Sequence, residues 1–198
     1  MCFIKNDNIN DLTKRIIDVF SSLIFLIVLS PLFVVIAVLI KLDSKGSVLF
    51  WACRFGRNKK LFSMPKFRTM IIGTPITDSD SFINPDLYIT NLGKFLRKTS
   101  IDEMPQLYCV LLGQMSLVGP RPALFNELDI VKLRDDKLIN FLKPGISGYA
   151  QINGHYNITN EEKVNLDYMY SKNINLCFDI KILFTTIFRL KWLKDISH

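Results

Sequence analysis

The feature that most constrains this chain is an apolar run of 22 residues, from Val19 to Ile40, that contains no charged side chain. As one straight helix the run would be about 33 Å long at 1.5 Å per residue, which is enough to cross the hydrocarbon core of a bilayer. Ser30 and Pro31 stand in its middle, where a proline removes one helix hydrogen bond and clashes with the preceding turn. The run therefore predicts a membrane helix with a break or kink at Ser30–Pro31.

Basic residues flank the apolar run on both sides, with Lys14 and Arg15 before it and Lys41 and Lys45 after it. The positive-inside rule therefore gives the helix no direction. Two structures fit: a kinked single span, or a helix that enters the membrane, bends at the proline and leaves by the same face. In the second structure the break must find partners for its freed carbonyls, and the Ser30 hydroxyl is a candidate.

The composition favours a membrane-bound protein that handles anions. The chain has 198 residues, a hydrophobic fraction of 49% and a net charge of +7. An excess of Lys and Arg beside apolar segments suits an anionic membrane face or a phosphate-bearing substrate. We find no helix-turn-helix, zinc-finger or RNA-binding signature, so no nucleic acid partner is expected.

The segment from Val48 to Phe67 predicts a small β-hairpin with a basic tip, because two apolar runs flank Arg57–Lys60. Lys66 and Arg68 follow at strand spacing, so both would project from one face and could grip a diphosphate, although a solvated strand face is the commoner explanation. Polar residues from Gly73 to Asp86 predict a loop. Further helices are expected over 92–98, 107–112, 124–141 and 161–170, and a glycine-rich loop over 143–154.

The C-terminal segment from Leu176 to Leu193 is apolar and aromatic, but charges interrupt it. The charges argue against a span. A helix lying in the membrane surface with its cations toward headgroups fits better, and a buried core helix is the alternative.

Two adjacent carboxylates, Asp102 and Glu103, stand where a helix is expected to begin, and Arg121 follows between Pro120 and Pro122. Together they could form a site for a metal and a phosphate, because a helix start also favours anions. The structural alternative is a helix cap, either a capping box from Ser100 to Glu103 or Asp102 itself as the capping residue.

Taken together these stretches resemble the monotopic phosphoglycosyl transferases, also called bacterial sugar transferases, in the short form that consists of the catalytic domain alone. The resemblance runs from about Lys14 to Lys191 and rests on several long motifs in order. They are Ser30–Pro31, Lys66–Met70, Leu96–Leu107, Gly113–Pro122 and Pro144–Gly154.

The resemblance implies an α+β, mostly helical fold with a re-entrant membrane helix-break-helix, a small β-hairpin and interfacial amphipathic helices. It implies one catalytic domain over residues 1–198, with the re-entrant helix at 14–41 and the catalytic part at 42–198. Its expected place is the cytoplasmic face of the bacterial inner membrane, where a homodimer would be unsurprising.

The family's reaction would transfer a sugar-1-phosphate from a UDP-sugar to undecaprenyl phosphate with release of UMP. By resemblance Asp102 is the nucleophile, Glu103 its partner, and Mg²⁺ the cofactor that both carboxylates would bind. We expect Arg121, held by Pro120 and Pro122, to clamp phosphate, with Lys66, Arg68 and Arg97 supplying further charge. The sugar is not indicated, and His155 stands where many members carry an arginine.

Overall fold

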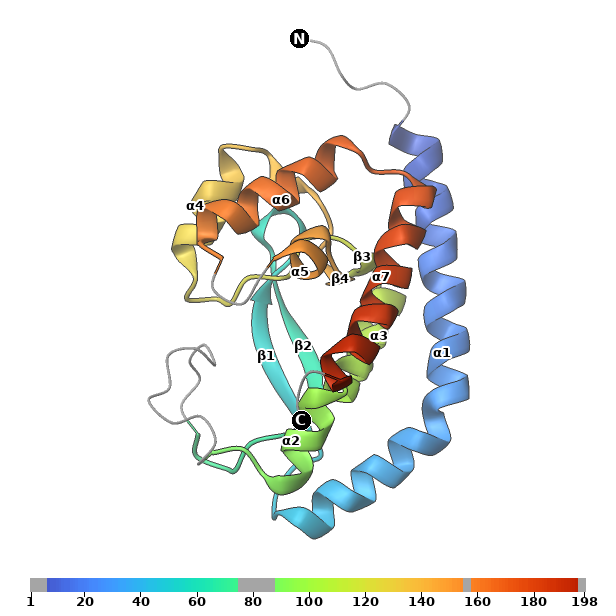
Figure 1. The fold of residues 1–198 in the computed structure, drawn as a ribbon, viewed down its shortest axis with the longest axis vertical. Helices are drawn as coiled ribbons and strands as arrows, with labels where there is room; N and C mark the ends of the chain where they lie inside the picture. Colours follow the sequence, from blue (N-terminus) through green and yellow to red (C-terminus); the bar gives the residue numbers. More distant parts are fainter. Residues whose placement is uncertain (1–6, 75–87, 155–157, 196–198) are drawn as a thin grey trace.

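A single long helix dominates the structure. The computed structural model describes residues 7–74, 88–154 and 158–195, with side chains described for 11–74, 88–154 and 158–188. Helix α1 runs from Asp7 to Asp43 and bends near its middle, so that its two arms point in different directions (Figure 1). From Asp11 to Asp43 it is long and apolar enough to cross a membrane, with a mean hydropathy of 3.3 and 11% of its most apolar window buried.

The expectation of a break at Ser30–Pro31 is corrected to a bend, because α1 is one continuous helix with Pro31 inside it. Proline has no N–H to donate to the carbonyl of Ile27, four residues earlier. The Ser30 hydroxyl donates to that same carbonyl at 2.8 Å. The serine thus replaces the missing donor, as the sequence predicts, and the helix continues through the proline.

The predicted hairpin is confirmed. Strands β1 (Leu49–Phe55) and β2 (Leu61–Phe67) pair antiparallel, and the short 3₁₀ helix η1 (Arg57–Lys59) forms the basic tip. One face of the hairpin packs into the main core through Phe62 and Met64. The hairpin therefore presents Lys66, near the end of β2, toward the centre of the molecule.

The glycine-rich segment over 143–154 was expected to be a loop, and this is wrong in part. It contains strand β4 (Gly145–Ser147) and helix α5 (Tyr149–Asn153), and β4 pairs in parallel with β3 (Ser116–Val118). A side chain at Gly145 would collide with the backbone of Gly119. The glycine thus permits a close approach of two backbones.

The remaining elements are helical. The segment over 124–141 forms two short helices instead of one, and the others lie close to their predicted ranges. They are α2 (Asn91–Lys98), η4 (Ile101–Gln106), α3 (Leu107–Leu111), α4 (Leu128–Asp135), η5 (Ile139–Phe141), α6 (Asn160–Lys172) and α7 (Leu176–Asp195). The expected loop over 73–86 lies mostly outside the described residues, as does His155.

Helix α7 is partly buried in the core, as the core-helix alternative predicts, and partly exposed. Ile182 is fully buried in the main core, whereas Phe184, Ile187 and Phe188 are exposed. Its Asp179 is also buried and pairs with Lys14 of α1, so this charge does not face solvent or headgroups. Figure 1 shows α7 running beside the N-terminal arm of α1. One face of α7 therefore belongs to the core, and the opposite face is an exposed apolar surface.

Both arms of α1 pack on the same globular body. In the N-terminal arm, Arg15 donates to the carbonyls of Val110 and Leu111 at 2.6 and 2.8 Å. In the C-terminal arm, Ile36 and Ile40 are buried in a cluster with residues of β2 and α2. Between these contacts α1 exposes apolar side chains, among them Phe20, Leu23, Ile24, Phe25, Ile27, Val28, Val34 and Val35.

Candidate active site

The candidate site lies where η4, strand β2 and the turn after β3 meet. Residue Ser100 takes a left-handed backbone conformation (φ 55°) immediately before η4, and its side chain makes no cap hydrogen bond. The 3₁₀ helix that follows carries Asp102 and Glu103 in its first turn. Neither capping alternative is therefore correct. Asp102 lies inside η4 and not at its cap position, and the Glu103 carboxylate binds two cations instead of returning to the backbone of Ser100.

Glu103 is the anion at the centre of the site. Lys66 Nζ donates to its Oε1 at 2.7 Å, and Arg121 Nη2 donates to the same oxygen at 3.2 Å. Burial opposes ionisation of Glu103, but Arg121 and Lys66 outweigh it and lower the pKa to about 2. Glu103 is thus a permanently charged carboxylate that holds a lysine and an arginine close together.

Asp102 has the opposite electrostatic environment, although it is the next residue. Its side chain is buried, with 8% of the residue exposed. Burial raises the pKa of Asp102 to about 6, and the neighbouring Glu103 adds to the rise, while Lys66 and Arg97 oppose it. At pH 7 the group is mostly ionised but is more basic than an ordinary aspartate. A basic carboxylate of this kind suits a nucleophile.

Arg121 projects from a backbone that is fixed on both sides. The amide of Gly145 donates to the carbonyl of Pro120 at 2.9 Å. Arg54 Nη1 donates to the carbonyl of Pro122 at 3.2 Å. The Arg121 side chain is still 48% exposed, and Glu103 raises its pKa. The turn therefore holds its backbone while leaving the guanidinium accessible to a ligand.

The structure brings Lys66, Arg121 and the two carboxylates together, with Arg97 close enough to stabilise Asp102 electrostatically. The Nε of Arg97 donates to Thr69 Oγ1 at 2.9 Å. Burial lowers the pKa of Lys66, against the effect of Glu103. These three cations form a positive rim around the acidic pair.

Arg68 lies elsewhere. Strand β2 ends at Phe67, so Arg68 does not share a strand face with Lys66. Its buried guanidinium donates to the carbonyls of Ser44 and Lys45 at 2.7 and 2.9 Å, at the C-terminal end of α1. Unpaired carbonyls at a helix C-terminus attract cations, so the structure accounts for Arg68 as a helix-end contact.

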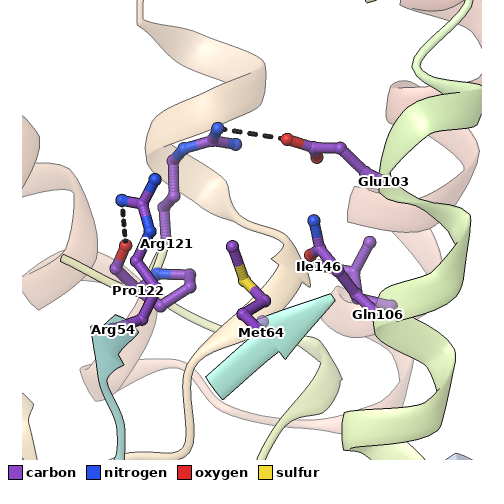
Figure 2. Close-up of a pocket in the computed structure, with 8 residues that line it drawn as sticks. Arg54, Met64, Glu103, Gln106, Arg121, Pro122 and Ile146 are labelled. Atoms are coloured by element: carbon purple, nitrogen blue, oxygen red, sulfur yellow. Dashed lines mark hydrogen bonds and ion pairs between the residues drawn. The ribbon is translucent and has the colours of Figure 1, made fainter. Parts of the chain in front are cut away.

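A pocket adjoins the acidic pair and includes residues that the sequence did not indicate. Figure 2 shows Glu103 and Gln106 on one side, Arg54 and Arg121 on the other, and Met64 between them. Pro122, Gly145 and Ile146 complete the lining. Arg54 and Gln106 stand inside or beside recognisable motifs, but an isolated arginine and an uncharged glutamine carry no chemical signal until the fold places them.

The acidic pair is also the candidate metal site. Within the described residues, no group of three or more His, Cys, Asp and Glu side chains could hold a metal ion. Mg²⁺, however, is often bound by one or two carboxylates together with substrate phosphates and water. Asp102 and Glu103 supply that donor set, so the residues present fit a magnesium ion that arrives with a diphosphate.

The chain is similar to known proteins over most of its length. The family described as bacterial sugar transferase matches residues 9–192. A UDP-glucose:undecaprenyl-phosphate glucose-1-phosphate transferase of Klebsiella pneumoniae is 39% identical, over 92% of this chain and 41% of that protein. An undecaprenyl-phosphate galactose phosphotransferase of Salmonella typhimurium is 38% identical, over 87% of this chain and 39% of that protein.

A third relative is of similar length to this chain. The exopolysaccharide production protein PSS of Rhizobium leguminosarum bv. phaseoli is 37% identical, over 88% of this chain and 92% of its own length. By contrast, the chain spans about two fifths of the length of the first two relatives. The family match covers almost the whole chain, including nearly all of α1 and every residue of the site. The chain belongs to the bacterial sugar transferase family.

Proposed function

We propose that this protein transfers a sugar-1-phosphate from a UDP-sugar to undecaprenyl phosphate, with release of UMP. The observation that carries the proposal is the pairing of a basic, buried Asp102 with a Glu103 that anchors Lys66 and Arg121. Two relatives support a UDP-sugar and undecaprenyl phosphate as the substrates. One is named as a UDP-glucose:undecaprenyl-phosphate glucose-1-phosphate transferase and the other as an undecaprenyl-phosphate galactose phosphotransferase. The relatives are named for more than one sugar, so the sugar stays open.

The reaction proceeds in two displacements. An Asp102 carboxylate oxygen attacks the phosphorus that bears the sugar, and the bond from that phosphorus to the oxygen of UMP breaks. UMP leaves with the bonding electron pair, and the sugar-phosphate stays on Asp102 as an acyl phosphate. A phosphate oxygen of the lipid then attacks the same phosphorus, and the aspartyl C–O–P link opens at the P–O bond. Asp102 is regenerated and the lipid carries a diphosphate linked to the sugar.

The surrounding residues have distinct tasks in this scheme. Arg121 and Lys66 would bind the equatorial phosphate oxygens, where charge accumulates in the transition state. Glu103 would hold both cations in place, while its low pKa keeps it from competing for the proton or the phosphorus. Mg²⁺, bound by the carboxylates and the diphosphate, would neutralise charge on the leaving group.

The contacts of α1 support a re-entrant membrane helix in preference to a kinked span. Arg15 and Asp18 of the N-terminal arm bind backbone groups of α3 and β3. Ile40 of the C-terminal arm is buried on the opposite side of the bend, in the cluster with Phe67. A single span would place these anchors on opposite faces of a bilayer core about 30 Å thick. Both arms can contact one globular body only if they leave the membrane on one side.

A UMP-release screen tests the proposal. Purified protein in nanodiscs is given a panel of UDP-sugars with Mg²⁺, with and without undecaprenyl phosphate. We expect one or a few UDP-sugars to give UMP in a lipid-dependent turnover, and Asp102→Asn to abolish release even without the acceptor. Full turnover by Asp102→Asn would exclude the covalent route. No release from any UDP-sugar, with the fold intact, would favour a non-catalytic membrane scaffold.

A further inference from the structure

One short reversal of the chain joins the two halves of the candidate site. Helix η4 carries the acidic pair and continues into α3, which ends at Leu111. Residues 112–115, here called the α3–β3 reversal, turn the chain back, and β3 then leads into the turn that carries Arg121. The ion pair of Glu103 with Arg121 joins the two halves again at the site. The α3–β3 reversal therefore determines how η4 and the Arg121 turn face one another.

Arg15 of α1 binds the first end of this reversal. Its Nη1 donates to the carbonyl of Val110 at 2.6 Å, and its Nη2 donates to the carbonyl of Leu111 at 2.8 Å. Carbonyls at the C-terminus of a helix attract cations in this way. Gly113 follows in the left-handed conformation (φ 84°), and a Cβ at this position would lie 3.2 Å from Arg15 Nη2. The glycine thus supplies both the backbone freedom for the turn and the space for the guanidinium.

Asp18 of α1 binds the other end. Its Oδ1 accepts a hydrogen bond from the amide of Leu117 at 3.0 Å, and only 4% of Asp18 is exposed. Strand β3 pairs with β4 along one edge, where the amide of Ser116 donates to the carbonyl of Pro144 at 2.9 Å. The next amide, that of Leu117, donates to α1 instead of to a strand. Asp18 is therefore the partner of a buried amide, which would be unfavourable without one.

One turn of α1 makes both of these contacts. Arg15 and Asp18 are three residues apart, so they lie on the same face of the helix. This face packs on α3, which lies beside α1 in Figure 1. Lys14 fixes the same arm to α7 through its ion pair with the buried Asp179, to which Tyr170 of α6 also donates, at 2.8 Å. The N-terminal arm of α1 thus fixes both ends of the reversal relative to the C-terminal helices.

We propose that Arg15 and Asp18 are positioning residues for the transfer reaction, because they fix the α3–β3 reversal and so set the distance between Asp102 and Arg121. The inference rests on the proposed function, since it assigns their effect to the displacement at Asp102. A shift of about 1 Å between reacting groups can lower a rate about 100-fold. The arm that sets this distance continues directly into the apolar run. Insertion of α1 into the membrane and the geometry of the site are therefore linked.

The test removes the acceptor of Asp18 and then restores it. Asp18→Leu has a similar size and no acceptor, whereas Asp18→Asn keeps an oxygen that can accept from Leu117. Asp11→Leu is the matched control, because Asp11 is exposed and lies about two turns earlier in α1. The UMP burst without acceptor lipid is measured in nanodiscs, as a rate constant and as an amplitude per protein molecule. We expect Asp18→Leu to lower the rate constant about 10–100-fold at full amplitude. Asp18→Asn should stay within about threefold of the native protein, and Asp11→Leu should not differ from it.

The two quantities separate positioning from folding. The amplitude counts the competent molecules, whereas the rate constant reports the geometry within each of them. A lower amplitude at the native rate constant would overturn the proposal, and so would an Asp18→Leu protein with both quantities unchanged. Arg15→Lys is the milder second variant, because an ammonium group cannot reproduce the fork that binds two carbonyls. It should lower the rate constant by about 3–10-fold at full amplitude, and it decides the matter if Asp18→Leu does not fold.

Hydrogen exchange separates this inference from the proposed reaction. Without substrates, exchange of the amides in residues 113–122 is compared by mass spectrometry in the native, Asp18→Leu and Asp18→Asn proteins. We expect exchange to rise at least about tenfold in Asp18→Leu and to stay within about twofold in Asp18→Asn. If the native protein gives no UMP burst but exchange rises, the reaction is wrong and the control of the reversal by Asp18 stands. If the burst occurs and exchange is unchanged, the positioning role is wrong and the reaction stands.

Discussion

Asp102 and Glu103 are adjacent in sequence, yet their surroundings separate their pKa values to about 6 and about 2. Two cations bind Glu103 directly, whereas Asp102 is buried beside a negative neighbour. Carboxylates whose pKa values are pushed apart in this way usually have different roles in a reaction. Here the more basic member is suited to attack phosphorus, and the more acidic one is suited to position charge.

This separation predicts the pH dependence of the first displacement. The nucleophile must be ionised. The rate of the UMP burst without acceptor should therefore fall about tenfold per pH unit as the pH drops below about 6. Glu103 stays ionised over this range because its pKa is about 2, so it does not contribute to the fall. Stopped-flow or quench measurement of UMP between pH 5 and pH 8 checks this. A burst that is constant down to pH 5 would show that Asp102 is not the titrating nucleophile.

The same pKa predicts an unusual effect on stability. The folded pKa of Asp102, about 6, exceeds the ordinary value of 3.8, so the folded protein binds this proton more tightly. The free energy of unfolding therefore falls as the pH rises from about 4 to about 6. Above that range the ionised Asp102 destabilises the folded protein. Asp102→Asn should stabilise the protein by roughly 1–3 kcal/mol at pH 8 and by little at pH 4.

Thermal unfolding of the two proteins in nanodiscs at pH 8 and pH 4 provides the measurement. Asp129→Asn, at an exposed position in α4, is the control for removing a charge. A loss of stability in Asp102→Asn at pH 8 would contradict a destabilising charge on Asp102 and with it the raised pKa of this residue.

At the scale of single elements, α1 shows how one serine keeps a proline helix continuous. The Ser30 hydroxyl donates to the Ile27 carbonyl, which Pro31 leaves without its usual partner. In an apolar environment an unpaired carbonyl costs about 1–3 kcal/mol. Ser30→Ala should lower stability by about that amount. Adding Pro31→Ala should recover most of it, because an alanine at this position supplies the missing N–H.

A double-mutant cycle on thermal stability in nanodiscs measures this coupling. Ser21→Ala, in the same helix but ten residues from the proline, is the matched control and should have little effect. Independent effects of Ser30→Ala and Pro31→Ala would contradict the assigned hydrogen bond.

The elements also show how far sequence patterns reach. Local signals predicted the hairpin, α2, α3, α6 and the carbonyl contact of Ser30, because turn residues, helical periodicity and proline chemistry act within a few residues. They did not predict the parallel pairing of β3 with β4, which joins residues about thirty apart. Spacing also suggested that Arg68 would accompany Lys66, but the end of β2 between them turns Arg68 toward α1.

The site itself was predictable in part. The acidic pair and Arg121 stood in recognisable motifs, and the fold brings them together with Lys66. What sequence could not show was the inequality of the two carboxylates, because it arises from burial and from cations on other elements. Gln106 and Arg54 were missed for the same reason, since their relevance depends on the pocket that tertiary packing creates.

At the scale of the whole molecule, the packing of both α1 arms on one body predicts the topology. Residues near the two ends of α1, such as Asp11 and Lys45, are both exposed. Single cysteines at these positions, in a protein without Cys2, Cys53 and Cys177, should both be protected from an impermeant thiol reagent added outside the cell. Both should react when inside-out vesicles are used. Labelling of the Asp11 position from outside the cell would establish a single span. It would place the N-terminal and C-terminal arms of α1 on opposite sides of the membrane and contradict their packing on one body.

The central claim is that Asp102 carries the sugar-phosphate between donor and acceptor. Intact-protein mass spectrometry after incubation with the active UDP-sugar and Mg²⁺, without lipid acceptor, tests it most directly. The account predicts a mass increase of one sugar-phosphate, mapped to the peptide that contains Asp102, absent in Asp102→Asn and discharged by undecaprenyl phosphate. A protein that turns over with both substrates yet never gains this mass, or gains it on another residue, would contradict the account.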